Sequence, residues 1–115
     1  MRLAVVGSRG FNDYEYLKAT LGKISDDIDC IISGGARGAD SLAARYSREK
    51  GIALQEYLPE YDKYGRGAPI VRNRLIVDDC DTLIAFWDGK SRGTRDSIDY
   101  ARKRGKRVII ELTGQ

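Results

Sequence analysis

Three polar, glycine-bearing segments of this 115-residue chain have residue types that could hold an anion. They are residues 7–9 (Gly-Ser-Arg), residues 33–40 (Ser-Gly-Gly-Ala-Arg-Gly-Ala-Asp) and residues 88–94 (Asp-Gly-Lys-Ser-Arg-Gly-Thr). Glycine lets the backbone approach a ligand closely and leaves the amide groups accessible. Where such a segment runs into a helix, free amides and the positive end of the helix dipole favour phosphate or carboxylate groups. The segments therefore predict anion binding.

Positively charged side chains strengthen this prediction. Arg9, Arg37, Lys90 and Arg92 all lie within the three segments. The glycine spacing is neither the G-x-G-x-x-G dinucleotide fingerprint nor a Walker A loop, so neither of those sites is predicted. Glycine after a strand also makes ordinary tight turns, and residues 7–9 taken alone fit a turn equally well. The two longer segments favour a ligand, because they combine several glycines with cations ahead of a helix.

Five short apolar runs alternate with helical patterns along the chain. The runs are continuously apolar, which is typical of parallel strands covered on both faces. Right-handed crossovers then predict a single Rossmann-like, doubly wound α/β domain over residues 1–115, with strand order 3-2-1-4-5 and four helices. The switch point of such a sheet, where ligands bind, lies between the first and fourth strands. The predicted strands are Leu3–Val6, Cys30–Ile32, Ile52–Tyr57, Thr82–Trp87 and Val108–Ile110.

Helix signals fall between these strands. Asn12 with Glu15 three residues later matches a capping box and predicts the first helix start. Residues 59–67 are expected to form a polar loop. The other helices are expected to run from Asp40 to Gly51, from Pro69 to about Val77, and from the end of the 88–94 segment to Gly105.

The composition argues against several kinds of chemistry. Two cysteines and no histidine argue against a zinc site and remove the base of a Ser-His-Asp triad. Cys30 and Cys80 adjoin apolar runs and are expected to be buried, reduced thiols. The formal charge of +3 favours anionic partners only weakly. No apolar run approaches the roughly 20 residues of a membrane helix, and no signal-peptide pattern opens the chain, so a cytoplasmic protein without a membrane partner is expected.

The three segments, together with Arg72-Asn73 and Trp87, resemble the SLOG superfamily, and within it the small YspA-type, cpYpsA-related branch. The resemblance follows the chain in order over nearly its whole length, and the string at residues 33–40 is its most specific part. The superfamily includes DNA-processing protein A, the LOG phosphoribohydrolases and sensor domains of bacterial immune systems. The resemblance implies a Rossmann-like fold and a pocket for nucleotides or NAD-derived signals such as ADP-ribose variants.

The resemblance also implies roles for particular residues. Residues 8–9 would contact a phosphate or a ribose, residues 34–37 would hold phosphate, and residues 72–73 would reach in from the third helix. Asp40 would either cap its helix or accept a hydrogen bond from a ribose hydroxyl group.

Apart from the resemblance, aromatic side chains could stack on a base: Trp87 and Tyr57 close their strands, and Tyr61 and Tyr64 lie in the expected loop. Trp87 could equally pack at the rim, and the two loop tyrosines could equally be exposed to solvent. The candidate ligand-binding residues are Gly7, Ser8, Arg9, Ser33, Gly34, Gly35, Ala36, Arg37, Asp40, Arg72, Asn73, Trp87, Asp88, Gly89, Lys90, Ser91, Arg92, Gly93 and Thr94.

One position departs from the hydrolytic members of the superfamily. The phosphoribohydrolases carry a pattern like Pro-Gly-Gly-x-Gly-Thr-x-x-Glu, whose glutamate serves N-glycosidic cleavage. Three residues after Thr94 this chain has Ser97, and Asp96 lies one residue early, which on a helix is about 100° of rotation. No catalytic residue is therefore predicted, and binding is favoured over hydrolysis.

Three functions follow, in order of preference. The first is binding of a phosphate-bearing, nucleotide-derived small ligand, such as an ADP-ribose-type or cyclic nucleotide signal, by a sensor or by a sequestering, anti-defence protein. The second is hydrolysis of a nucleotide N-glycosidic bond, and the third is single-stranded DNA binding. A homodimer or higher homo-oligomer is expected, and no metal ion or cofactor is predicted beside the nucleotide ligand.

Overall fold

The computed structural model of the chain describes residues 1–24 and 27–114. In these residues five parallel strands form one sheet in the order β3-β2-β1-β4-β5, which confirms the predicted order and the doubly wound α/β class. β4 has the predicted bounds, and each other strand differs from its prediction by one or two residues at one or both ends. The strands are β1 (Arg2–Gly7), β2 (Cys30–Ser33), β3 (Ala53–Glu56), β4 (Thr82–Trp87) and β5 (Arg107–Leu112).

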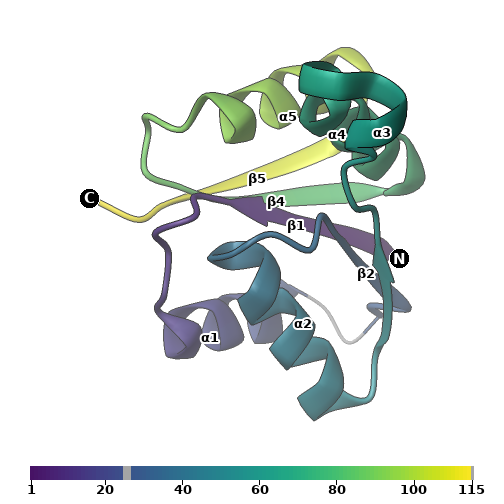
Figure 1. The fold of residues 1–115 in the computed structure, drawn as a ribbon. Coiled ribbons are helices and arrows are strands. Elements are labelled where there is room, and N and C mark those ends of the chain that lie inside the picture. Colours follow the sequence, from purple (N-terminus) through teal and green to yellow (C-terminus); the bar gives the residue numbers. More distant parts are fainter. Residues whose placement is uncertain (25–26, 115) are drawn as a thin grey trace.

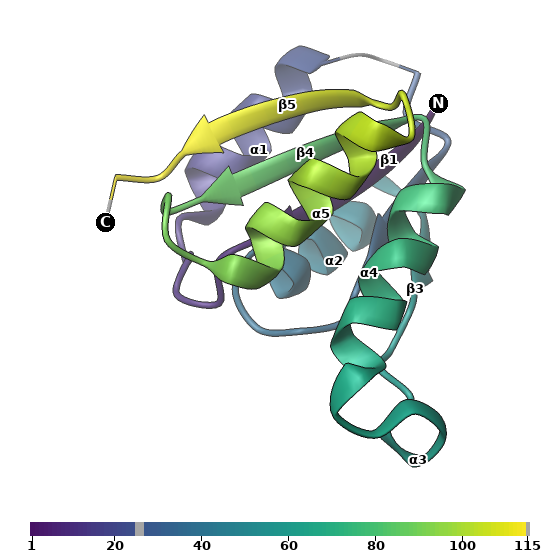
Figure 2. The same ribbon diagram turned by 90° about the horizontal axis from the view of Figure 1, so that it is seen from above.

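The four predicted helices cover the two faces of the sheet. Figure 1 shows α1 and α2 on one face, and α4 and α5 on the other. The described residues also contain a helical turn, α3 (Tyr61–Tyr64), followed by a 3-10 turn (Gly65–Gly67), inside the expected loop. Figure 2 shows α3 protruding beyond the start of α4. The longer helices are α1 (Tyr14–Ile24), α2 (Ala39–Lys50), α4 (Ala68–Asp79) and α5 (Arg92–Lys103).

Side chains of the central strands alternate between two buried layers. On β1, Leu3 and Val5 pack with α1 and α2, whereas Ala4 and Val6 pack with α4 and α5. Because both faces are covered, the strand reads as a continuous apolar run. Both cysteines are buried free thiols, as predicted, and burial raises the pKa of Cys80 to about 11. No helix in the described part of the chain has both the length and the hydropathy required to cross a membrane.

The starts of the first two helices are not capped as predicted. α1 begins at Tyr14, and the carboxylate of Asp13, not the side chain of Asn12, accepts the Tyr16 amide hydrogen at 3.1 Å. Asp13 takes this role because it immediately precedes the first helical residue, where a side-chain oxygen reaches the third amide of the helix. α2 begins at Ala39, so Asp40 lies within the first turn instead of capping the helix.

The expected loop folds into turns through local backbone bonds. The amides of Lys63 and Tyr64 both donate to the carbonyl of Glu60, at 3.1 and 3.0 Å. No residue of α3 is buried. A single exposed turn has no apolar periodicity, which is why the sequence pattern did not reveal it.

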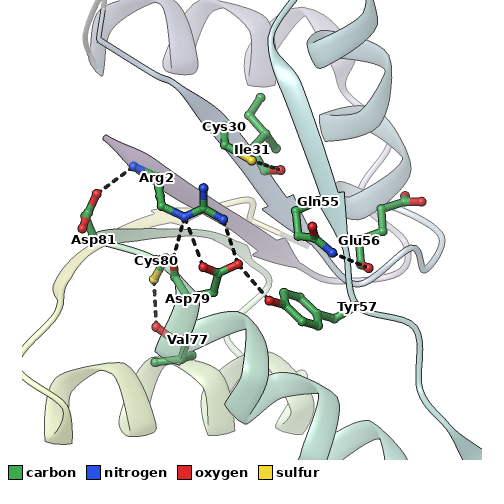
Figure 3. Close-up of polar contacts among 10 residues, drawn as sticks. All are labelled: Arg2, Cys30, Ile31, Gln55, Glu56, Tyr57, Val77, Asp79, Cys80 and Asp81. Atoms are coloured by element: carbon green, nitrogen blue, oxygen red, sulfur yellow. Dashed lines mark hydrogen bonds and ion pairs between the residues drawn. The ribbon is translucent and has the colours of Figure 1, made fainter.

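A polar cluster ties the amino end of β1 to α4 and to the chain after β3 (Figure 3). The guanidinium of Arg2 donates to both carboxylate oxygens of Asp79, at 3.1 and 2.9 Å, and Tyr57 Oη donates to the same carboxylate at 2.9 Å. The amide of Arg2 donates to Asp81 at 2.8 Å. These contacts fix α4 against the sheet.

Glycine is required where α2 and the loop after β1 approach each other. A Cβ atom at position 7 would lie 2.5 Å from the Phe86 carbonyl oxygen and 2.6 Å from Ala39 Cβ. Gly38 has a φ of +79°, and a Cβ atom there would overlap the Ser8 carbonyl oxygen and lie 2.7 Å from that of Arg9. The two loops therefore touch backbone to backbone.

The same substitution at two glycines should change stability in opposite directions. We expect Gly7→Ala to lower the free energy of unfolding by about 1–3 kcal/mol, because the added methyl group overpacks a closed contact. In the matched variant Gly22→Ala the methyl group meets no atom within 4 Å, and the exposed helical position should gain up to about 1 kcal/mol. Urea denaturation measures both, and an unchanged stability of Gly7→Ala would contradict the close packing.

Candidate functional site

A cavity of about 470 Å³ opens at the carboxyl end of β1. It lies between the first turns of α2 and α5, with α4 along one side, at the predicted switch point. Its base is apolar and its walls are polar and glycine-rich. The lining residues are Val6, Gly7, Ser8, Arg9, Gly10, Ala36, Asp40, Pro69, Arg72, Asn73, Ile76, Asp88, Ser91, Gly93, Thr94 and Ser97.

The cavity brings together residues from all the predicted segments. The candidate residues that line it are Gly7, Ser8, Arg9, Ala36, Asp40, Arg72, Asn73, Asp88, Ser91, Gly93 and Thr94. The candidate residues that lie outside its lining are Ser33, Gly34, Gly35, Arg37, Trp87, Gly89, Lys90 and Arg92.

Sequence reasoning missed some lining residues that a helical spacing could have found. On α4, Pro69 and Ile76 lie one turn before and after the predicted pair at residues 72–73. On α5, Ser97 follows Thr94 by three residues, so both lie on one helix face. The walls therefore extend along the helices beyond the loops.

Ser8 and Asp88 join the loops after β1 and β4. The buried Ser8 donates its amide to the Phe86 carbonyl at 3.0 Å, and its Oγ accepts the Asp88 amide at 3.1 Å. Asp88 Oδ1 accepts the amides of Lys90 and Ser91, each at 2.8 Å. Hydrogen bonds from these amides, first that of Ser91, lower the pKa of the Asp88 carboxyl group. An ionised carboxylate therefore shapes the turn into α5.

The start of α5 presents small side chains to the cavity. Ser91 caps the helix, with its Oγ 3.4 Å from the Thr94 amide and 3.1 Å from Thr94 Oγ1. Ser97 is buried, and its Oγ donates to the Gly93 carbonyl at 3.3 Å. The first amides of a helix lack acceptors within the helix, so this end of α5 can donate to an anion.

Asp40 holds the loop after β2. Its side chain is buried, and Oδ2 accepts the Ala36 amide at 3.1 Å, while Arg72 Nη1 donates to the Gly34 carbonyl at 2.8 Å. Burial raises the pKa of the Asp40 carboxyl group, opposed by the Ala36 amide, the charge of Arg72 and the Gly34 amide. The predicted helix-capping role is therefore wrong, because the carboxylate faces the preceding loop and not the amides of its own helix.

Exposed cations surround the opening. Arg9 lines the cavity, and Arg37, Lys90 and Arg92 lie outside it on the adjoining loops. None of these four forms an ion pair within the part of the chain that the structure describes. Their charges are therefore free to attract an anion.

Trp87 has a packing role. Its Nε1 donates to the Ser91 carbonyl at 3.0 Å, and its half-buried ring packs against the layer under α4 and α5. Asp96 is paired with Arg74 at 3.0 Å and does not line the cavity, in agreement with the rotation expected from its position on the helix.

Residues 1–64 match a family model described as the YspA, cpYpsA-related SLOG family. The chain belongs to this family. One relative is the Gene 61 protein of Mycobacterium phage D29. The two sequences are 34% identical over 120 residues, and the alignment covers 94% of each chain. The predicted superfamily and branch are thereby confirmed for this YspA-related SLOG protein.

Solved structures share the fold of the SLOG chain. DNA processing protein A from Streptococcus pneumoniae superposes with a TM-score of 0.80 at 19% identity, over 95% of this chain and 49% of that one. DNA processing protein A from Helicobacter pylori, whose structure was solved to study its single-stranded DNA binding mode, superposes with a TM-score of 0.77 at 21% identity. The superposition covers 100% of this chain and 67% of that one. The SLOG chain thus spans about half the length of the pneumococcal protein.

The buried Asp40 should leave a pH signature on stability. Because its folded-state pKa is raised above the ordinary 3.8, the folded state binds the proton more tightly, and stability is lost as pH rises from 3.8 through the raised pKa. Urea denaturation at a series of pH values measures the free energy of unfolding of the wild type and of Asp40→Asn. We expect the wild-type value minus the variant value to fall as the pH rises through this range.

Asp88→Asn is the control with the opposite sign. The pKa of Asp88 is lowered. The free energy of unfolding of the wild type minus that of Asp88→Asn should therefore rise with pH, up to about pH 3.8. A difference for Asp40→Asn that stayed flat or rose would contradict the assigned burial.

Proposed function

We propose that the cavity binds the sugar-phosphate part of a nucleotide-derived small ligand, such as an ADP-ribose-type or cyclic nucleotide signal. The observation that carries this proposal is the meeting of two helix starts and two arginines, Arg9 and Arg72, around one concave space. A volume of about 470 Å³ falls within the roughly 300–1,000 Å³ of small-molecule sites. None of the described residues in its lining is aromatic, which suits ribose and phosphate better than a base.

Binding is a better use of this cavity than hydrolysis. Ser97 lines the cavity, and it stands at the sequence position where the phosphoribohydrolase pattern has its glutamate. The carboxylates in the lining belong to Asp40 and Asp88, and both accept backbone amides that hold loops. Neither carboxylate can act as a general acid or base without releasing the loop that it holds.

Single-stranded DNA binding is the second candidate. It is favoured by the likeness to the Helicobacter pylori protein and by the exposed cations Arg37, Lys90 and Arg92 outside the cavity. DNA binding would depend steeply on salt, because each phosphate contact releases counterions. The affinity for a small ligand enclosed by the cavity would depend much less on salt concentration.

Arg9→Ala tests the proposed site. Arg9 lines the cavity without an ion-pair partner in the described residues, so its loss should weaken ligand binding by about 1.5–3 kcal/mol, the net value of a charged hydrogen bond, and leave the melting temperature unchanged. Isothermal titration calorimetry of hits from a thermal-shift screen of nucleoside phosphates, ADP-ribose isomers and cyclic nucleotides measures the change.

Arg48→Ala is the matched control. It removes the same charge from the exposed last turn of α2, the opposite end of that helix from the cavity, and should leave the affinity unchanged. If no nucleotide shifts the melting temperature while a short oligonucleotide does, with a steep salt dependence, the DNA candidate replaces the proposed one.

A further inference from the structure

A second cavity, of about 520 Å³, adjoins the first on the α1 side of the loop after β1. The two cavities share Ser8, Gly10 and Asp88, so one ligand can reach both across the loop. Gly10 is exposed, and a Cβ atom there would meet nothing within 4 Å, so the shared rim is open at this point. The other residues that line the second cavity are Phe11, Asn12, Asp13, Tyr16, Leu112 and Thr113.

The second cavity has the apolar rings that the first lacks. Phe11 stacks on Phe86 with ring centroids 5.0 Å apart, and Tyr16 meets both rings edge-on at 6.4 and 6.0 Å. Tyr16 is 37% exposed and Leu112 is 67% exposed, so apolar surface at the wall faces solvent. A flat aromatic ligand group would cover this surface.

The exposed ring is held in place. Tyr16 Oη donates to Glu111 on β5, and the Tyr16 amide donates to Asp13 Oδ1 at 3.1 Å. The hydrogen bond to Glu111 raises the pKa of the Tyr16 hydroxyl above its ordinary value. The amide of Thr113 donates to the Trp87 carbonyl at 2.8 Å, which fixes the chain next to Leu112.

Charge distinguishes the two cavities. Arg9 and Arg72 line the first, whereas no lysine or arginine is among the described residues that line the second. In the first cavity the two arginines balance the carboxylates of Asp40 and Asp88. In the second cavity the carboxylates of Asp13 and of the shared Asp88 face no cation among the described lining residues, so they would repel phosphate and accept hydrogen bonds from amino groups of a base. These charges favour a nucleotide whose phosphate points toward the first cavity.

We propose that the second cavity is the nucleobase subsite, built from Tyr16, Phe11 and Leu112, of a nucleotide whose sugar-phosphate occupies the first. This inference rests on the proposed function and extends it from a phosphate site to a base-reading site. It assigns the base to the side of the sheet under α1 and next to the end of β5. Stacking of a base on an aromatic side chain contributes roughly 5- to 150-fold in affinity.

The test compares ligands with and without a base. Isothermal titration calorimetry is performed with AMP, with ADP-ribose and with ribose 5-phosphate on the full chain. Tyr16→Ala and Leu112→Ala are expected to weaken binding of AMP and ADP-ribose by roughly 5-fold or more and to leave ribose 5-phosphate unchanged. Tyr61→Ala, at a 56% exposed tyrosine on α3, is the control and should change none of the three affinities.

The outcomes separate the two proposals. If Tyr16→Ala and Leu112→Ala leave the AMP affinity unchanged while Arg9→Ala lowers it, the base subsite is refuted and the phosphate site stands. If the wild type binds neither these three probes nor any nucleotide of the thermal-shift screen, both proposals are refuted. Should Tyr16→Ala fail to fold, Leu112→Ala decides, because its side chain is mostly exposed and contributes little to the core.

Discussion

The cavity depends on the backbone contact between the start of α2 and the loop that follows β1. A side chain larger than hydrogen at position 7 or 38 would meet backbone or buried atoms of the other segment. Since both positions are glycine, the Ser8 and Arg9 carbonyls lie directly against the turn into α2, and the two loops form one continuous wall. Widening this contact by a methyl group would separate the α2 helix start from the end of β1 and would disrupt the cavity between them.

Hydrogen bonds within the protein then hold the three loops in their places. Ser8 joins the loop after β1 to Asp88, Asp88 shapes the turn into α5, and Asp40 and Arg72 hold the loop after β2. Because these groups hydrogen-bond to one another, contacts within the protein define the walls of the cavity. Preorganised donors are effective because they require little rearrangement when charge arrives.

The likeness to DNA processing protein A shows a shared fold and does not identify a ligand. TM-scores of 0.80 and 0.77 at 19% and 21% identity show the same fold built with mostly different residues. The fold brings the carboxyl ends of β1 and β4 together in each case, and the side chains there decide what is held. In this SLOG chain those side chains include Ser97, two arginines facing one cavity, and aromatic rings facing its neighbour.

The sequence by itself determined the sheet, because continuous apolar runs follow local periodicity. It also determined the strand order and the edge at which the cavity forms, because right-handed crossovers restrict the topology and the glycine-rich segments follow the strands. It also determined that Asp96 points away from the site, since one residue on a helix is a known rotation. Only the tertiary structure decided that Arg37 and Lys90 lie outside the cavity and that Ser97 lies inside it. The direction of a loop side chain depends on contacts made across the chain, such as that of Arg72 with Gly34, 38 residues away, and no local pattern encodes such a contact.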